Sequence, residues 1–202
     1  MRYTRRFWYE VQRALLVQWG TPYCRRYKLK RKYRGYMDIC KRIQVVFLVS
    51  LSCIGLDQAT KILASQELSK NVMISYLSDL LRVGYTENIG AFLGLGNTLS
   101  DEYRFGFFVI AVGTFLLGLL AYIVTSSKQN LSSLIALSMV FSGGFSNFYD
   151  RVTNNGAVID FLNVGIGSVR TGVFNVADVA IMIGVLMLLL PHNSLKIQRA
   201  SL

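Results

Sequence analysis

Two aspartates stand out because of where they fall relative to the last apolar run of the chain. Asp160 belongs to residues 156–161, and Asp178 ends residues 174–178, which lead directly into that run. Charge at the edge of a hydrophobic span is costly unless it has a partner or a function. Asp178 alone is equally well explained as a carboxylate that stabilises a helix N-terminus. The pair, with Asn175 beside it, favours a chemical role.

Two carboxylates held a few ångströms apart share a proton near neutral pH, because both cannot ionise cheaply. The ionised member can take a proton from water as the water attacks a carbonyl, and the neutral member can protonate the carbonyl oxygen and the leaving amine. This is the chemistry of aspartic proteolysis. Since coupled groups titrate as a pair, neither Asp160 nor Asp178 is assigned a fixed role.

The composition indicates a membrane protein. Of the 202 residues, 52% are hydrophobic, which is too many for an ordinary soluble domain of this size. The net charge of +11 comes from one end of the chain, since residues 1–42 hold 13 of the 22 lysines and arginines. We therefore expect a topological cause for the charge and no binding of nucleic acid.

Cysteine and histidine offer no metal-binding pattern. Cys24, Cys40 and Cys53 have no spacing typical of a disulfide framework or a zinc site, and His192 follows the last apolar run with no acid or cysteine near it. We expect neither a metal nor an organic cofactor.

Four apolar runs predict the fold, an α-helical integral membrane protein with four transmembrane helices. They cover residues 43–56 (extendable to 63), 105–125, 131–148 and 173–190. Residues 57–104 are rich in glycine and contain a β-prone stretch, which predicts a small extracytoplasmic cap that contains β structure. Residues 149–172 are expected to form a polar loop. Small residues in the third run, among them Gly143, predict close helix contact.

The first 36 residues are set apart by their charge. They carry eleven basic residues and one acid, and they form either a poorly ordered basic extension, which we favour, or an amphipathic segment on anionic lipid. We divide the chain into residues 1–36 and a membrane domain of residues 37–202. Met37 is also a plausible alternative start.

Basic residues predict the orientation. The N-terminal arm, the turn at 126–130 and the tail hold 16 lysines and arginines, whereas the other side holds six, so both termini are expected to be cytoplasmic. The outer ends of the four spans then bring together a set of polar residues from separate parts of the chain: Asp57, Asn88, Asn147, Asp150, Arg151, Asp160, Asn175 and Asp178.

Five blocks in this order resemble the lipoprotein signal peptidase (signal peptidase II) family. They are residues 57–61 (DQATK), 87–92 (ENIGAF), 143–151 (GGFSNFYDR), 158–161 (VIDF) and 174–178 (FNVAD). The resemblance implies a bacterial inner-membrane aspartic endopeptidase, with its active site at the periplasmic face and residues 37–202 as the peptidase domain. Such an enzyme cleaves prolipoproteins N-terminal to a diacylglyceryl-modified cysteine, works among membrane lipids and is inhibited by the cyclic peptide globomycin.

The resemblance also implies roles for individual residues. Asp160 and Asp178 take the catalytic positions, and the supporting or substrate-binding positions fall on Asp57, Lys61, Asn88, Gly143, Asn147, Arg151 and Asn175. Two departures concern local geometry: Ser146 stands where a glycine is usual, and residues 91–94 look offset from the common pattern.

Other functions remain open at this point. A small proton-linked carrier would use Asp160 and Asp178 as a relay, although carriers place such groups near mid-bilayer and often have repeated halves. A serine and lysine pair drawn from the outer segments is a second catalytic alternative. A structural membrane subunit would not need either acid.

Overall fold

The computed structural model describes residues 37, 39–90, 101–126 and 129–190. Residues 1–36, the tail with His192 and the offset stretch at 91–94 were discussed above and lie outside the described residues. The domain boundary after residue 36 therefore stays a prediction.

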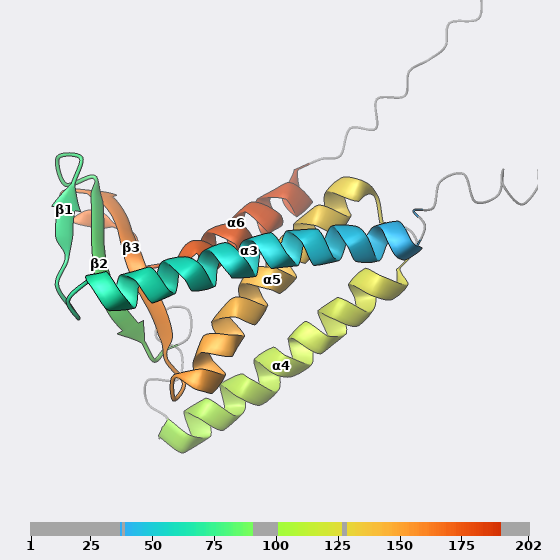
Figure 1. Cartoon of the computed structure of the whole chain (residues 1–202), viewed down its shortest axis with the longest axis horizontal. Helices are drawn as coiled ribbons and strands as arrows, with labels where there is room; N and C mark the ends of the chain where they lie inside the picture. The colour runs from blue at the N-terminus through green and yellow to red at the C-terminus, as the bar shows by residue number, and fades with distance from the viewer. Residues whose placement is uncertain (1–36, 38, 91–100, 127–128, 191–202) are drawn as a thin grey trace, which may run out of the picture. The chain divides into compact units, whose positions relative to one another are not determined.

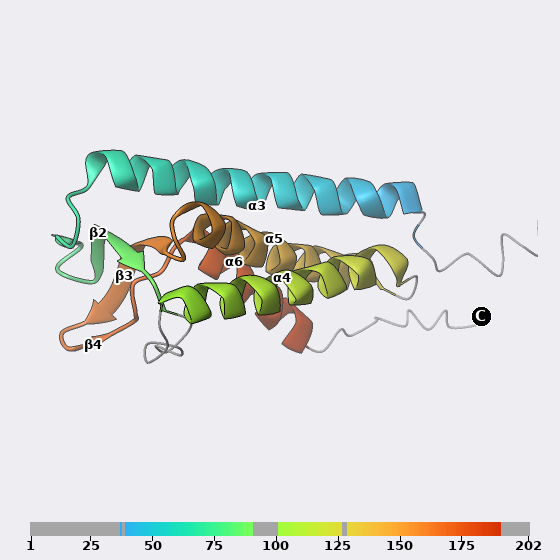
Figure 2. The ribbon, with the colours of Figure 1, turned by 90° about the horizontal axis from the view of Figure 1, so that it is seen from below.

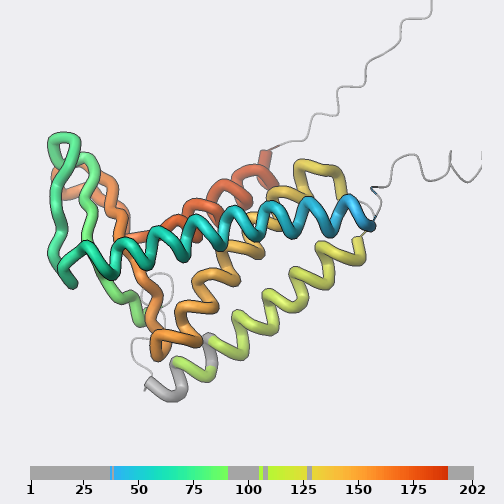
Figure 3. The backbone as a smooth tube through the Cα atoms, viewed as in Figure 1, coloured from blue at the N-terminus to red at the C-terminus, as the bar shows by residue number. Residues whose placement is uncertain are grey.

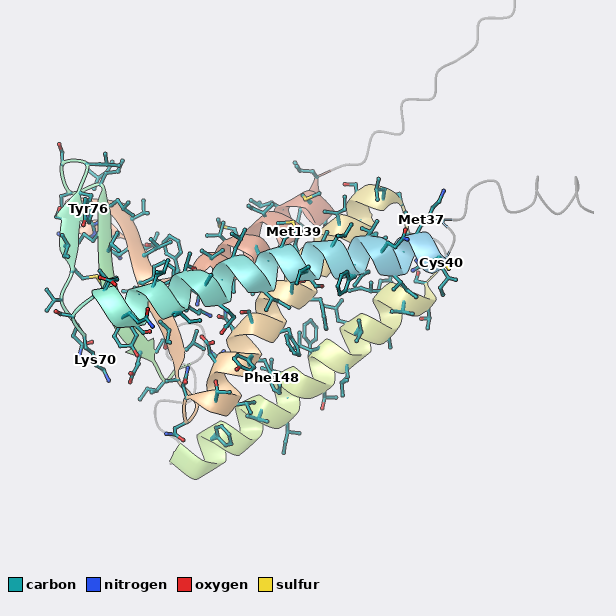
Figure 4. The ribbon with its side chains drawn as sticks, viewed as in Figure 1. Met37, Cys40, Lys70, Tyr76, Met139 and Phe148 are labelled. Carbon is teal, nitrogen blue, oxygen red and sulfur yellow. The ribbon has the colours of Figure 1, made fainter. Side chains whose placement is uncertain are left out.

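The described part of the chain contains four helices that run side by side (Figures 1 and 2). They are α3 (Ile39–Glu67), α4 (Asp101–Thr125), α5 (Leu131–Thr153) and α6 (Val176–Leu189). Helix α5 packs against each of the other three. Figure 4 shows Cys40 at one end of α3 and Lys70 and Tyr76 beyond its other end, where the sheet lies.

The first three predicted apolar runs lie within α3, α4 and α5, and most of the fourth, residues 173–190, forms α6. Helices α3 and α5 are long and apolar enough to cross a membrane, while α6 and the apolar part of α4, Val109–Thr125, are shorter. Apolar side chains of α3 and α4 are exposed to an extent that a soluble core helix would not tolerate, with Phe47 62% and Leu117 70% exposed. Lipid is the environment that suits such surfaces.

A four-stranded antiparallel sheet lies at one end of the helices, as the backbone trace in Figure 3 makes clear. Its strands are β1 (Ile74–Tyr76), β2 (Leu81–Asn88), β3 (Val158–Ile166) and β4 (Val169–Arg170), in the spatial order β1-β2-β3-β4. Strands β1 and β2 form the β structure expected within residues 57–104, and they share one sheet with β3 and β4 from later in the chain.

Two expectations about these segments were wrong. Residues 149–172 are not a polar loop, because they contain the end of α5 and the strands β3 and β4. Four glycines favoured a loop there, although the β-branched and aromatic residues of 158–166 suit a strand. Residues 57–67 continue α3 and do not belong to the cap, in agreement with the extension of the first apolar run to residue 63; no glycine or proline lies within residues 57–67.

Two glycines let α5 and α6 approach closely. A Cβ on Gly143 would meet the carbonyl oxygen of Ala177 and the side chain of Ile181, and one on Gly184 would lie 2.6 Å from the carbonyl oxygen of Ala136. The small residues of residues 131–148 thus provide the helix contact that their pattern predicts. Gly143 acts by having no side chain.

Gly143→Ala is therefore expected to lower the free energy of unfolding by about 1–3 kcal/mol, because α6 must move away from α5. Gly55→Ala is the matched control, since nothing lies within 4 Å of a Cβ at that helical position. The control should be neutral or slightly stabilising. Thermal unfolding in detergent micelles measures both, and equal effects would contradict the close contact.

Candidate active site

Asp178 lies in the first turn of α6, where a capping box holds it. Asn175 is the N-cap residue: its Oδ1 accepts a hydrogen bond of 3.0 Å from the Asp178 amide, and Asp178 Oδ2 accepts one of 3.1 Å from the Asn175 amide. Asp178 Oδ1 accepts a third bond, 2.9 Å, from Asn147 Nδ2. Asp178 therefore does cap the N-terminus of α6. Because a carboxylate has about four acceptor positions, capping leaves room for a proton or a water.

Asp160 lies on β3 with 3% of its surface exposed. Its Oδ1 accepts a bond of 2.7 Å from Asn175 Nδ2, and its Oδ2 accepts one of 3.0 Å from Asn88 Nδ2. Asn175 therefore touches both acids, through its amide nitrogen on Asp160 and through its carbonyl oxygen on the Asp178 amide. One fully buried side chain sets the two carboxylates relative to each other.

A β-bulge in β2 brings Asn88 onto the face of the sheet that carries Asp160. Val83 pairs with Leu162 and Thr86 pairs with Asp160, so three steps along β2 match two along β3. Because side chains alternate between faces, regular pairing would have turned residue 88 away from Asp160. The extra residue explains why alternation in residues 80–86 is poor.

Asn147 on α5 connects the acids to a deeper cluster. Its Oδ1 accepts bonds from Asn175 Nδ2 at 3.0 Å and from Lys61 Nζ at 2.9 Å, while its Nδ2 donates to Asp178. The side-chain amide thus uses its oxygen on donors and its nitrogen on an acceptor, as its chemistry requires.

The deeper cluster is a buried ammonium between two carboxylates. Lys61 Nζ lies 2.7 Å from Asp57 Oδ2 and 2.8 Å from Asp150 Oδ2. With Asn147, the three partners use all three N–H groups of the lysine. Lys61, Asp57 and Asp150 are at most 2% exposed. We call these three residues the Lys61 cluster.

The Lys61 cluster joins four elements of the fold. Asp57 on α3 accepts a bond of 2.8 Å from the Ala177 amide, so it helps to cap α6 from another helix. Asp150 on α5 accepts one of 3.3 Å from the Ile159 amide on β3. The elements that carry Asp160 and Asp178 are therefore both held by this cluster.

Arg151 contacts backbone carbonyl groups. Its guanidinium donates to the carbonyl oxygens of Asn147 at 3.2 Å and Gly90 at 3.3 Å. Asp150, its neighbour in sequence, pairs with Lys61 instead. Gly143 lies in the α5–α6 contact and has no chemical group to offer.

Burial dominates the electrostatics of Asp160 and raises the pKa of its carboxyl from 3.8 to about 6. The hydrogen bond from Asn88 works against that rise, the negative charge of Asp178 adds to it, and the bond from Asn175 and the charge of Lys61 oppose it. Asp160 can therefore exchange a proton near neutral pH, as the proton-sharing hypothesis requires.

The contacts of two members of the network, Ser146 and Gln58, were not predicted. Ser146 Oγ donates to Asp57 Oδ2 at 2.7 Å and accepts from Gln58 Nε2 at 2.9 Å, and Gln58 Nε2 also donates to Asp150 Oδ1 at 2.8 Å. A signal for Ser146 was present in the sequence. Ser138, Ser142, Ser146 and Asp150 recur every four residues on an apolar helix, which indicates one buried polar face.

Comparison with known proteins supports one family. The family model described as "Signal peptidase (SPase) II" matches residues 49–192. A lipoprotein signal peptidase of Geobacter sulfurreducens is 39% identical over 145 residues, covering 69% of this chain and 86% of the relative. One of Staphylococcus haemolyticus is 30% identical over 148 residues, covering 73% and 90%.

Solved structures agree with the sequence relatives. Two structures described as a bacterial membrane enzyme match with a TM-score of 0.63 and 28% identity, covering 72% of this chain and 85% and 90% of theirs. The match to the family model spans well over half of the chain and contains the acids, their amide partners and the Lys61 cluster. The chain belongs to the signal peptidase II family of membrane peptidases.

Proposed function

We propose that this protein is an aspartic endopeptidase that removes signal peptides from prolipoproteins by cleaving N-terminal to a diacylglyceryl-modified cysteine. The observation that carries the proposal is the contact of Asn175 with both Asp160 and the first turn that holds Asp178. Family membership supports the substrate class, and the pair of acids supports the reaction type.

In the proposed reaction, one proton is shared between Asp160 and Asp178. The ionised carboxylate takes a proton from water while the water oxygen bonds to the scissile carbonyl carbon, and the neutral acid donates its proton to the carbonyl oxygen. The carbon–nitrogen bond of the tetrahedral intermediate then breaks as the carboxyl that took the proton from water gives it to the amine nitrogen, while a hydroxyl group of the intermediate returns its proton to the other carboxylate. One carboxylic acid and one amine leave, and the pair again holds a single proton.

The proposed location is the bacterial inner membrane, with four spans, both termini in the cytoplasm and the sheet as an extracytoplasmic cap. The distribution of basic residues supports this orientation. The acids lie where the sheet meets the helices, so a lipid-anchored substrate would present its scissile bond there. Contact with membrane lipids and inhibition by globomycin are further expectations from the family.

Neither alternative is favoured by the geometry. A carrier needs its ionisable relay along the middle of its spans, whereas Asp160 lies on a strand. A serine nucleophile needs lysine as a base, but Lys61 has its three N–H groups occupied by Asp57, Asp150 and Asn147. The other described outer lysine, Lys70, pairs with Glu87 at 2.7 Å.

Asp160→Asn and Asp178→Asn are each expected to lower the cleavage rate by roughly 10³-fold or more, because asparagine keeps the size but cannot exchange the proton. The assay uses purified protein and a synthetic prolipoprotein that carries a diacylglyceryl-cysteine, with product masses identifying the bond that is cut. Asp79→Asn is the matched control, since Asp79 lies in the turn between β1 and β2, where it bonds to Arg82 and Ser75 and not to the pair, and should keep wild-type activity. Both active-site variants cutting at near wild-type rates would refute the two-acid mechanism.

The raised pKa of Asp160 predicts a pH-dependent gain in stability for Asp160→Asn. A carboxyl with a higher pKa in the folded state stabilises the fold below pH 3.8, and this contribution is lost as the pH rises through about 6. Above pH 6, the buried charge of Asp160 lowers the free energy of unfolding by at most roughly 3 kcal/mol. Thermal unfolding at pH 7.5 should therefore show Asp160→Asn to be more stable than the wild type, with the difference shrinking toward pH 4.

For Asp79→Asn, the expected change in stability at neutral pH has the opposite sign. Hydrogen bonds from Arg82 and Ser75 hold the pKa of the Asp79 carboxyl well below its usual range. Asp79→Asn should therefore lose stability at neutral pH. A loss of stability for Asp160→Asn at both pH values would contradict the desolvation account.

A further inference from the structure

Ser146 is a fully buried hydroxyl inside the network that supports the acids. It lies on α5, directly before Asn147, and its surface is 0% exposed. Its Oγ donates to Asp57 Oδ2 at 2.7 Å and accepts from Gln58 Nε2 at 2.9 Å. The reaction proposed above assigns no role to this residue.

The Ser146 hydroxyl is connected to α6, the helix that carries Asp178, through the carboxylate of Asp57. Asp57 Oδ2 accepts hydrogen bonds from Ser146 Oγ and Lys61 Nζ. Asp57 Oδ1 accepts a hydrogen bond of 2.8 Å from the Ala177 amide. Ala177 precedes Asp178 in the first turn of α6. The orientation of the Asp57 carboxylate therefore sets where that turn, and the Asp178 side chain with it, can lie.

Lys61 alone does not fix this orientation. Its ammonium is attracted to Asp57, Asp150 and Asn147 at once, and a charge can be satisfied over a range of angles. A short hydroxyl-to-carboxylate bond is more directional, and bonds to charged groups are among the stronger hydrogen bonds in proteins. Ser146 supplies that bond from the same helix that places Asn147 on Asp178.

We propose that Ser146 is a positioning residue for cleavage, because its hydroxyl orients Asp57 so that the first turn of α6 holds Asp178 against Asp160. The inference rests on the proposed two-acid function. Ser146 itself touches no substrate, since it is sealed between α3 and α5.

The test compares Ser146→Ala with Ser142→Ala. Ser142 lies one turn earlier on α5, is equally buried and bonds to Ser50 Oγ and the Ser138 carbonyl instead of the Lys61 cluster. Both changes remove one buried hydroxyl from one helix. Ser146→Cys keeps the size and a weak donor, and it serves as the reporter if the alanine variant does not fold.

Ser146→Ala is expected to lower kcat about tenfold with KM unchanged. The kcat of Ser146→Cys should lie between those of Ser146→Ala and the wild type. The kcat of Ser142→Ala should stay within about twofold of the wild-type value. The pH profile separates positioning from loss of folded enzyme. The folded fraction is therefore measured at each pH, and kcat is expressed per folded enzyme, which removes the effect of unfolding. An Asp178 that lies farther from Asp160 raises the pKa of Asp160 less, so the alkaline limb of the corrected profile moves to lower pH. Lys61 and Arg151, the other charges near the pair, are unchanged in these variants.

Equal effects of Ser146→Ala and Ser142→Ala, or a loss that is uniform across pH, would overturn the positioning role while leaving the two-acid mechanism intact. The proposed function fails in a different way. If Asp160→Asn and Asp178→Asn still cut the substrate, the two acids are not the catalytic pair and both proposals fall.

Discussion

The placement of Lys61 between Asp57 and Asp150 is the interaction on which the site depends. A buried ion cluster of this kind gives little net stability, yet removal of one partner leaves an unpaired buried charge and costs roughly 3–5 kcal/mol. The helices and the sheet must therefore meet in the one arrangement that completes the Lys61 cluster. Because Asp57 also binds the Ala177 amide and Asp150 binds the Ile159 amide, completing it fixes both elements that carry the candidate catalytic acids.

The two acids reach their positions by different local means. Asp178 is set by a capping box, which holds its carboxylate in the first turn of α6. Asp160 is set by a strand, and a bulge in the neighbouring strand turns Asn88 toward it. Burial disfavours the charge of Asp160, and that penalty is tolerated because Asn175 and Asn88 bond the carboxylate and the surrounding structure is fixed elsewhere. The cost of desolvation therefore falls on one of the two candidate catalytic acids.

Much of this arrangement could be predicted from the sequence because it follows from local patterns. Apolar runs located the four helices, and the capping pattern placed Asp178 at a helix start. The topology argument gathered Asn88, Asn147 and Asn175 at one end, where the structure bonds them to the acids. The strands within residues 149–172 were missed because the glycines around them favoured a loop and residues 158–166 do not alternate between apolar and polar. The four-residue recurrence on α5 indicates that Ser146 is buried, but its partner Asp57 lies 89 positions away in the chain, and no local pattern specifies that contact.

The most direct test of the account is the cleavage rate of the double variant Asp160→Asn/Asp178→Asn, set beside each single variant in the diacylglyceryl-cysteine prolipoprotein assay. Groups that act as one unit are strongly non-additive, because the loss of either member already removes the function of both. The account predicts that the double variant is no slower than the slower single variant. Losses that multiply in the double variant would show that Asp160 and Asp178 act independently and would contradict a shared-proton pair.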